Sequence, residues 1–258
     1  MKILVLEEVG STMEAAAEVF SRGEDVQAVM ALRQTAGRGR QGRRWRALEA
    51  PYGLAVTYVV PGGLGEQGAL VVAWAVYRAL RKVKGFEDSR VRGFEDSRMK
   101  GREIRLKWPN DVLIGGDKVC GILCENREDV GLGRYALVGV GVNIVAPEGE
   151  SLVLEGGRRL GFLGAKVAPE ELARVVGGCI FADIQLYREQ GWQMFHDNYA
   201  AACVTIGQRV RWRKPSHNNE IDELTGLARG LNQGGQLELV GDDGTVHVVA
   251  SGEIIETR

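Results

Sequence analysis

The chain has 258 residues, 45% of them hydrophobic, which suffices for one large globular domain or a catalytic domain with a small appendage. Lys and Arg total 33 against 34 Asp and Glu, so the net charge of -1 gives no overall attraction to nucleic acid or to a membrane surface. The short apolar N-terminus excludes a signal peptide, and no apolar run approaches the ~18 residues of a membrane helix, so we expect a cytoplasmic protein.

The first third of the chain alternates predicted strands and helices. Residues 1–6 form a predicted strand. Ser11-Thr12-Met13-Glu14 then has the Ser-x-x-Glu form of a capping box, which predicts a helix that begins there and ends near Arg22. Continuous apolar and β-branched runs predict further strands, and helical periodicity predicts one more helix. These strands are 26–32 and 54–60, the helix is 69–80, and 37–46 is a predicted loop.

A polar segment of the chain is duplicated. Val83–Arg90 recurs almost verbatim as Val91–Arg98, and Met99–Arg102 begins a third, decayed copy. Two copies cannot form a solenoid, which needs about three or more repeats to bury a core. We interpret residues 83–102 as a surface insertion, which is tolerated because lengthening a loop costs little free energy. A partner-binding role is the alternative.

The second half of the chain changes from helical to β periodicity. Residues 112–120 are two short apolar runs around a Gly-Gly-Asp turn, which predicts a hairpin, and 135–144 is a predicted strand. Residues 169–202 have helical spacing, whereas 204–258 alternate β-rich runs with turns. This change predicts a catalytic domain over 1–203 and a small β-barrel domain over 204–258.

Neither the cysteines nor the histidines form a recognisable site. Cys120 and Cys124 lie four residues apart on a predicted strand, about 13 Å from each other, so we interpret the cysteines as reduced core residues. His196, His217 and His247 are scattered along the chain. Their spacing supports neither a protein-bound metal cluster nor a Ser-His-Asp triad.

The stretch Gly37–Gly42 matches the dinucleotide pattern G-x-G-x-x-G, but its surroundings do not fit. That motif requires a helix that opens at the third glycine and an acidic residue about 20 positions later. Here Arg43-Arg44-Trp45 follows, Pro51 interrupts, and the region about 20 residues on is a predicted apolar strand. NAD binding is therefore not expected.

What remains is a basic loop around Trp45. Its arginines are Arg38, Arg40, Arg43, Arg44 and Arg46. A site for a small anion is one interpretation. An RNA-binding segment is a second, because a tryptophan among arginines can stack on a base. A solvated loop is the third, and the loop alone does not decide among them.

Two later segments carry further candidate residues. Lys107-Trp108-Pro109-Asn110-Asp111 ends in the predicted hairpin, which places Lys118 just past its turn. Lysines on adjacent strands could both point into one pocket, although a solvated lysine is the commoner case. In Gly139-Val140-Gly141-Val142-Asn143, alternate glycines clear one face of a strand, either for an apolar ligand or for tight strand packing.

Taken in order, these segments resemble the biotin protein ligase family. That family carries Gly-Arg-Gly-Arg-x-Gly-Arg-x-Trp, Lys-Trp-Pro-Asn-Asp, Gly-Ile-Leu and Gly-x-Gly-x-Asn, which stand here at 37–45, 107–111, 121–123 and 139–143. The resemblance covers nearly the whole chain. It implies an α/β (α+β) fold, in which a mixed sheet packed with helices forms a class II synthetase-like biotin/lipoate ligase catalytic domain. A small C-terminal SH3-like β-barrel would follow.

The resemblance also implies roles for individual residues. The catalytic residues would be Lys118 and Arg40. The biotin-binding residues would be Ser11, Thr12, Met13, Gln34, Arg38, Gly39, Arg40, Lys118, Gly121, Gly139 and Gly141. The ATP-binding residues would be Arg40, Arg43, Trp45, Lys107, Asn110, Lys118 and Asn143. The chain departs from the family at Met13, where the family often has Asn.

The function implied is a two-step ligation. Biotin and ATP, with Mg²⁺, would form biotinyl-5'-AMP, and biotin would pass to a lysine of the biotin carboxyl carrier domain of acetyl-CoA carboxylase or a related carboxylase. Fixed positive charge suits the first step, because a carboxylate and the α-phosphate of ATP repel each other. A slot of glycines and valines capped by a few hydrogen bonds suits the biotin ring system.

The resemblance also limits the binding partners that we expect, and two alternative functions remain. Some family members carry an N-terminal DNA-binding domain, but here the matching pattern begins at Met1, so we expect a monofunctional ligase that binds neither DNA nor a membrane, as a monomer or homodimer. The nearest rival is a lipoate or octanoate protein ligase, which shares the fold. An RNA-binding protein that uses the loop 38–46 is the rival from another class.

Overall fold

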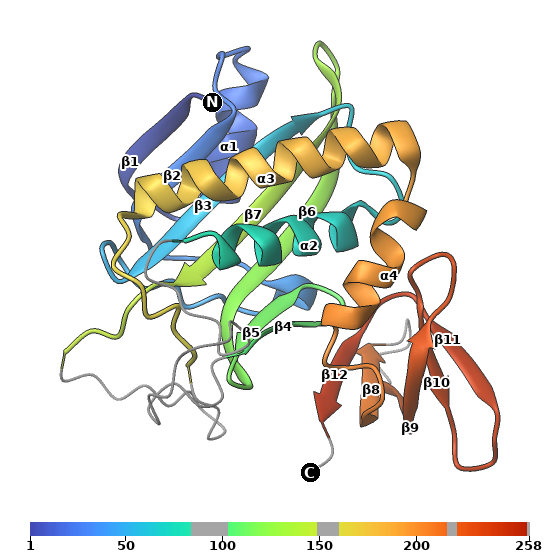
Figure 1. Ribbon diagram of the computed structural model, residues 1–258. Helices are drawn as coiled ribbons and strands as arrows, with labels where there is room; N and C mark the ends of the chain where they lie inside the picture. The colour runs from blue at the N-terminus through green and yellow to red at the C-terminus, as the bar shows by residue number, and fades with distance from the viewer. Residues whose placement is uncertain (84–102, 149–159, 216–220, 257–258) are drawn as a thin grey trace.

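A computed structural model describes residues 1–83, 103–148, 160–215 and 221–256 of the chain (Figure 1). Apart from Val83, which is buried, the duplicated segment 83–102 lies outside the described residues. The interpretation of this segment as a surface insertion therefore stays a prediction.

A seven-stranded mixed sheet forms the centre of the N-terminal 200 residues. Its strand order is β1-β2-β3-β7-β6-β5-β4. Only β1 and β2 are parallel neighbours, and all the other pairs are antiparallel. The strands are β1 (Ile3–Val9), β2 (Ala28–Gln34), β3 (Gly53–Pro61), β4 (Ile104–Lys107), β5 (Asp111–Ile114), β6 (Asp117–Asp129) and β7 (Gly133–Asn143). The mixed sheet packed with helices that the sequence predicts is thus confirmed.

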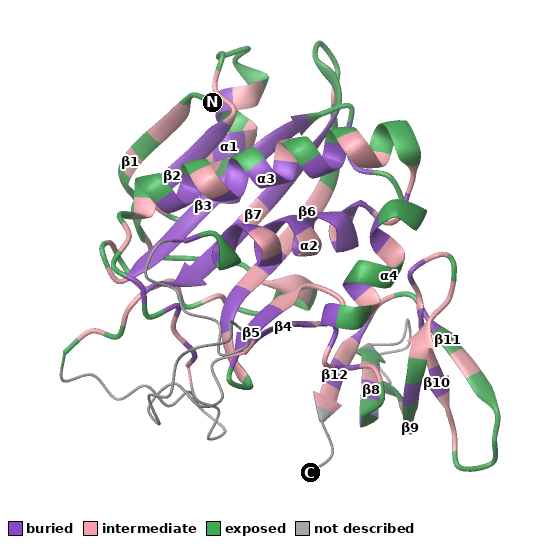
Figure 2. Cartoon of the chain, in the orientation of Figure 1, coloured by how far each residue is buried: buried purple, intermediate pink, exposed green. Residues whose placement is uncertain are grey.

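The two faces of this sheet are covered differently. Helices α2 (Gly68–Arg81) and α3 (Pro169–Gln190) cover one face, and their inner sides are buried against it (Figures 1 and 2). Because side chains alternate along a strand, Val56 and Tyr58 of β3 point into this main core while Thr57 points to the other face. That second face is covered by α1 (Thr12–Ser21) and by loops.

Helix α1 begins where the capping pattern predicts. The Ser11 hydroxyl accepts a hydrogen bond from the Met13 backbone N–H at 3.3 Å, which satisfies one of the unpaired donors of the first turn. Glu14 was expected to complete a capping box, but its carboxylate pairs with Arg38 at 2.6 Å and with Arg127 at 3.2 Å. The start of this helix is therefore fixed by Ser11, and Glu14 serves a contact outside the helix.

The hairpin around the Gly-Gly-Asp turn is also confirmed. Strands β5 and β6 are joined by Gly115 and Gly116, whose φ angles are 60° and 90°. Positive φ at both central residues is the requirement of a type I′ turn, the two-residue turn whose twist matches a hairpin. This turn sets the register that brings Asp111 of β5 close to Lys118 of β6.

The C-terminal residues form a second sheet. It is antiparallel and five-stranded, in the order β11-β10-β9-β8-β12. The strands are β8 (Arg209–Pro215), β9 (Ile221–Leu231), β10 (Leu237–Val240), β11 (Val246–Val249) and β12 (Glu253–Glu256). Strands β11 and β12 are its two edges, so the ladders of the described residues form an open sheet. Closure into a barrel stays a prediction.

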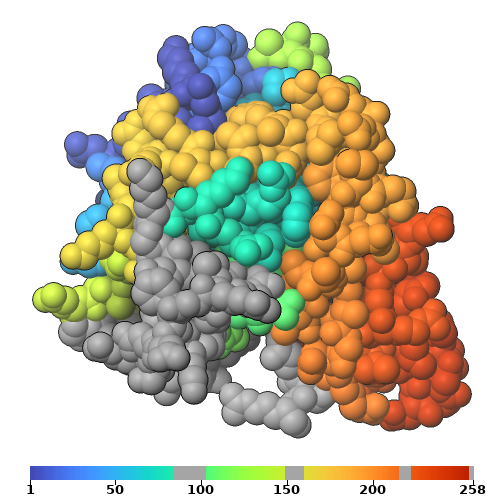
Figure 3. All heavy atoms as spheres, viewed as in Figure 1, coloured from blue at the N-terminus to red at the C-terminus, as the bar shows by residue number. Residues whose placement is uncertain are grey.

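The second sheet packs against one end of the N-terminal unit that the seven-stranded sheet and its helices form. Helix α4 (Gln193–Ala202) lies between them, and the change from helix to strand falls at 203–208 (Figures 1 and 3). The turn between β9 and β10 makes one of the contacts: its Gly235 carbonyl accepts from the Trp108 indole N–H at 3.3 Å, and its Gly234 carbonyl accepts from Gln67 at 3.4 Å.

Two general expectations can be compared with the fold. Each cysteine is a free thiol and three of the four are buried, which agrees with the prediction of reduced core residues. Burial raises the pKa of Cys124 to about 12. Within the described ranges, no helix is both long enough and apolar enough to cross a membrane.

A partly buried ion pair joins α2 to α3. The Asp183 carboxylate accepts a hydrogen bond from Arg78 at 2.6 Å, and its side chain is only 4% exposed. Asp183→Ala should lower the free energy of unfolding in urea by about 2 kcal/mol, because Arg78 then loses its partner in a partly buried position. Glu170→Ala on the same helix removes an exposed pair with Arg174 and should cost under about 0.5 kcal/mol. Equal losses would contradict this assignment.

Candidate functional site

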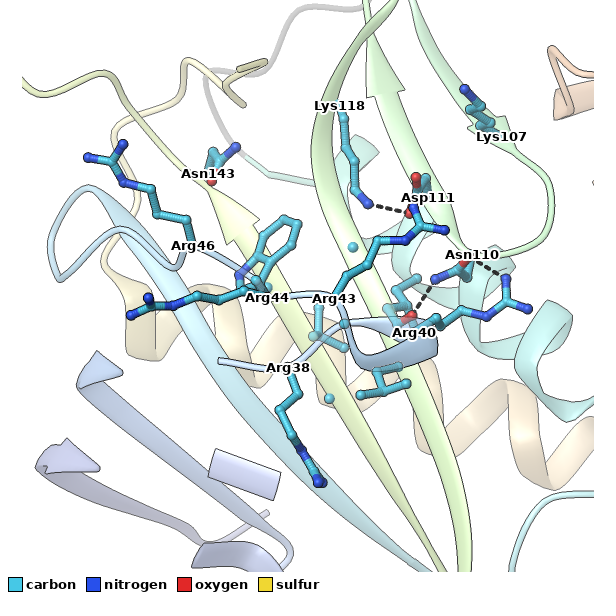
Figure 4. A pocket seen from close by; sticks show the side chains of 18 of the residues that line it. Arg38, Arg40, Arg43, Arg44, Arg46, Lys107, Asn110, Asp111, Lys118 and Asn143 are labelled. Atoms are coloured by element: carbon cyan, nitrogen blue, oxygen red, sulfur yellow. Dashed lines mark hydrogen bonds and ion pairs between the residues drawn. The ribbon is translucent and has the colours of Figure 1, made fainter. Parts of the chain in front are cut away.

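A cavity of about 650 Å³ lies on the sheet face opposite α2 and α3. The loop 37–46, the β5–β6 hairpin, β7 and the first turn of α1 surround it, and β12 of the second sheet reaches it. Figure 4 shows the charged residues that line it. All the residues for which the family resemblance implies a role line this one cavity. They are Ser11, Thr12, Met13, Gln34, Arg38, Gly39, Arg40, Arg43, Trp45, Lys107, Asn110, Lys118, Gly121, Gly139, Gly141 and Asn143.

One end of the cavity carries uncharged hydrogen-bonding groups. The Thr12 backbone N–H and the Thr12 hydroxyl both donate to the side-chain oxygen of Gln34, at 2.8 and 3.0 Å. Thr12 is 3% exposed and Ser11 is 8% exposed, so these groups are largely shielded from water. This end therefore suits an uncharged ligand group that both donates and accepts hydrogen bonds.

The floor of the cavity is a patch of the sheet without side chains. Gly121 of β6 is the register partner of Gly141 of β7, and Gly139 lies two residues before Gly141. A Cβ at Gly139 would lie 2.8 Å from the Met13 sulfur, one at Gly121 would lie 2.8 Å from the Trp45 ring, and one at Gly141 would overlap that indole. These glycines therefore serve close approach by side chains from α1 and the loop, rather than packing between strands.

The other end of the cavity is cationic. Lys118 Nζ lies 2.7 Å from the Asp111 carboxylate and 5.3 Å from the centre of the Trp45 ring. Arg40 donates to the Asn110 side-chain oxygen at 3.0 Å, and Asn110 in turn donates to the Ile122 carbonyl at 2.6 Å. Figure 4 shows Arg40, Arg43 and Lys118 gathered around Asp111 and Asn110.

The electrostatics of this end favour an anion. Burial lowers the pKa of Arg40, and the nearby Asp111 carboxylate opposes that effect. The guanidinium nonetheless stays charged at neutral pH, since arginine begins from a very high pKa. A partly desolvated cation held in a fixed position attracts a bound anion more strongly than one in water does.

The loop 37–46 has more structure than the sequence predicts. Gly39 N–H donates to the Arg43 carbonyl at 2.7 Å, Trp45 N–H donates to the Gly37 carbonyl at 2.9 Å, and a short 3-10 turn, Arg40–Gly42, forms its tip. Arg44 and Arg46 point away from Arg40 and Arg43, and Arg38 points in a third direction (Figure 4). The arginines thus do not form one continuous basic surface, which argues against the nucleic-acid interpretation.

Arg38 is held at the mouth of the cavity. Its guanidinium lies 2.6 Å from Glu14 and 3.5 Å from Glu125, and Arg127 pairs with the same two carboxylates at 3.2 and 2.8 Å. The hydrogen bond from Arg127, opposed by partial burial and helped by the charges of both arginines, lowers the pKa of Glu14. Arg38 and Glu14 therefore connect the loop to α1.

Lys107 and Asn143 take positions that the sequence does not predict. Lys107 is on β4 and Lys118 is on β6, with β5 between them, so the two lysines are not on adjacent strands, although both line the cavity as the sequence suggests. Figure 4 shows Lys107 directed away from the Lys118–Asp111 pair. Asn143 is buried and donates to the Gly161 carbonyl at 3.1 Å, so it fastens the chain around residue 161 to β7.

Two acidic residues of the site were missed in the sequence. Asp111 stands beside Asn110 in a segment already singled out, and its opposite charge across the hairpin from Lys118 was the available signal. Glu253 of β12 lies 2.7 Å from Arg43 and 3.4 Å from Arg213, with its side chain 16% exposed. It is 210 residues from Arg43, and no local pattern indicates the contact.

Comparison with known proteins gives a consistent result. The model of the biotin/lipoate A/B protein ligase family matches residues 6–143. The biotin--[acetyl-CoA-carboxylase] ligase of Mycobacterium tuberculosis is 29% identical over 98% of this chain and 88% of its own. The biotin protein ligase of Aquifex aeolicus, solved with biotin and ATP, is similar with a TM-score of 0.74 and 25% identity, covering 100% of this chain and 99% of its own. The biotin protein ligase of Leishmania major, solved with biotinyl-5-AMP, has a TM-score of 0.62 and 26% identity over 97% and 99%.

The Arg43–Glu253 pair should hold the loop 37–46 closed. Glu253→Gln weakens the pair and should raise the rate of trypsin cleavage at Arg43 and Arg44 about 2- to 5-fold, because a partly exposed ion pair contributes about 0.5–1 kcal/mol. The fragments are identified by mass spectrometry. Glu238→Gln removes a comparable pair with Arg229 in the same sheet and should leave this rate unchanged. Equal cleavage in the two variants would show that Glu253 does not hold the loop.

Proposed function

Because the chain belongs to the biotin/lipoate A/B protein ligase family, we propose that it is a biotin protein ligase, which forms biotinyl-5'-AMP from biotin and ATP and transfers the biotin to a lysine of an acceptor protein. The observation that carries this proposal is the order of groups along the cavity. An uncharged hydrogen-bonding end, a side-chain-free floor and a cationic end follow one another. Biotin has a ureido ring, an apolar body and a carboxylate in the same order.

The cationic end suits the first half-reaction. The biotin carboxylate attacks the α-phosphate of ATP, pyrophosphate leaves, and two anions must approach each other. Lys118, fixed by Asp111, and Arg40, fixed by Asn110, can offset that repulsion without moving during the reaction. We therefore assign Lys118 and Arg40 as the catalytic residues, with Arg43, Trp45, Lys107, Asn110 and Asn143 on the ATP side.

The uncharged end and the floor suit biotin itself. Ser11, Thr12 and Gln34 would bind the ureido head, and the three glycines would lie under its rings. Met13, which replaces the Asn common in the family, packs on Gly139 and offers an apolar surface rather than a hydrogen bond. Arg38 and Gly39 would contact biotin from the loop.

The loop suits the second half-reaction. The neutral amine of the acceptor lysine attacks the acyl carbon of biotinyl-5'-AMP, an amide bond forms, and AMP leaves. The mixed anhydride must be kept from water until the acceptor arrives. The loop 37–46 lies over the cavity and is fastened by Arg43 to Glu253 and by Arg38 to Glu14.

Mg²⁺ fits the residues of the cationic end as a companion of ATP. Mg²⁺ in nucleotide sites is bound by phosphate oxygens and water with one or two carboxylates. Asp111 would supply such a carboxylate from the wall of the cavity. The ion would neutralise part of the phosphate charge.

Other properties follow from the proposal. The acceptor is the biotin carboxyl carrier domain of acetyl-CoA carboxylase or a related carboxylase, as the name of the Mycobacterium tuberculosis relative suggests. The free thiols agree with a cytoplasmic location. The five-stranded sheet would be an SH3-like barrel domain over 204–258, and the enzyme would act as a monomer or homodimer.

One assay tests the proposal against its rival within the family. Purified protein is incubated with ATP, Mg²⁺, biotin and a biotin carboxyl carrier domain, and the product is detected with streptavidin. We expect biotin transfer and no comparable attachment of lipoate, because a dithiolane ring cannot use the hydrogen-bonding end formed by Thr12 and Gln34. Transfer of lipoate in place of biotin would make the protein a lipoate ligase.

Substitutions of the two catalytic residues, Lys118 and Arg40, should impair the enzyme in different ways. Lys118→Ala should lower biotin-dependent pyrophosphate release about 100- to 1000-fold, since it removes a fixed charge from the reacting groups. Arg40→Gly should release biotinyl-AMP and label lysines of unrelated proteins, because it loosens the loop. Lys166→Ala, an exposed lysine outside the cavity, is the matched control and should behave as the wild type. Full activity of Lys118→Ala would overturn the assignment of the cationic end.

A further inference from the structure

A buried threonine lies behind the hydrogen-bonding end of the cavity. Thr57 is on β3, within an otherwise apolar run, and is fully buried. It faces the cavity side of the sheet beside its register partner Gly139, but it does not line the cavity. Its hydroxyl lies 2.9 Å from the hydroxyl of Thr12.

The direction of the hydrogen bonds in this chain of groups is forced. The Thr12 backbone N–H can only donate, so the Gln34 atom that it contacts at 2.8 Å is the amide oxygen. The Thr12 hydroxyl, 3.0 Å from that oxygen, must donate its one hydrogen there. Thr57 is therefore the donor to Thr12, and Thr12 is the acceptor.

This direction determines what the end of the cavity offers. The Gln34 oxygen already accepts two hydrogen bonds, so the groups that this cavity-lining side chain can still offer a ligand are the two N–H donors of its amide nitrogen. The Thr12 oxygen has donated its hydrogen and accepted one bond, which leaves it a single lone pair. A matching ligand must accept from Gln34 and donate to Thr12 through neighbouring atoms. A cyclic urea, with a carbonyl oxygen beside N–H groups, has that arrangement.

We propose that Thr57 is a positioning residue for the ureido head of biotin, which it selects by holding the Thr12 hydroxyl as a hydrogen-bond acceptor for the ligand. This inference rests on the proposed function. Thr57 acts only through Thr12 and does not touch the ligand. If Thr57 lacks its hydroxyl, the Thr12 side chain is held by Gln34 alone, and the buried Thr12 oxygen loses the donor that Thr57 supplied.

The test separates this role from a contribution to stability. Thr57→Val keeps the size of the side chain and removes the hydroxyl. Tyr58→Phe is the matched control, because it deletes a buried hydroxyl at the next position of β3, where Tyr58 donates to the Ala173 carbonyl at 2.7 Å on the opposite face. Both variants should lower the melting temperature by a similar amount.

Only Thr57→Val should change the recognition of biotin. We expect the KM for biotin in pyrophosphate release to rise about 3- to 10-fold, which corresponds to the loss of one buried hydrogen bond, with the KM for ATP and kcat within about twofold. The KM for desthiobiotin, which keeps the ureido ring, should rise by the same factor in Thr57→Val. Thr57→Ser should restore the wild-type KM, and Tyr58→Phe should not alter it.

A double-mutant cycle tests the route through Thr12. In a Thr12→Ala background, Thr57→Val should change the KM for biotin by less than about twofold, because the Thr12 hydroxyl through which Thr57 acts is already absent. If Thr57→Val does not fold, Thr57→Cys, with a weak S–H donor, gives the same comparison.

The outcomes are distinguishable. Absence of biotin transfer by the wild-type protein would refute the proposed function. Transfer by the wild type, with an unchanged KM for biotin in Thr57→Val, would refute only the role of Thr57. An equal rise in the KM for ATP, or a full effect in the Thr12→Ala background, would also overturn it.

Discussion

The rest of the structure depends on one constraint: a patch of the central sheet must carry no side chains. Gly121, Gly139 and Gly141 are neighbours on β6 and β7, and any Cβ there would collide with Met13 or with Trp45. The main core on the other face is filled by α2 and α3, and on this face Met13 and Trp45 pack on the glycines at the wall of the cavity. Helix α1 and the loop 37–46 then form the walls around the bare patch.

The cationic groups around that patch are held in position by partners within the chain. Lys118 is paired with Asp111, Arg40 with Asn110 and Arg43 with Glu253, and in each case the partner belongs to a regular strand or its end. A charged side chain that is already oriented loses less conformational entropy when it meets its ligand. Preorganised cations also need little rearrangement as charge develops, which is the main electrostatic advantage of a protein site over water.

Local chemistry made much of this architecture predictable. Ser11 caps α1, Gly115 and Gly116 form the β5–β6 turn, and the alternate glycines lie on a strand that lines a cavity, because each signal is contained within a few residues. The features that the sequence did not predict depend on contacts between distant segments. Glu253 meets Arg43 only after two sheets have packed together, and Thr57 matters only through the face on which β3 places it.

The contact between Arg43 and Glu253 couples the C-terminal sheet to ligand binding in the cavity. The same β12 strand is anchored to β8, and the turn before β10 is anchored to Trp108 and Gln67. Thermodynamic linkage is reciprocal. A ligand that favours the ordered loop therefore strengthens the attachment of this sheet. The attached sheet strengthens ligand binding by the same free energy. Substitutions on the inner side of the second sheet, far from the bare glycine patch, therefore alter affinity without altering a single group that touches the ligand.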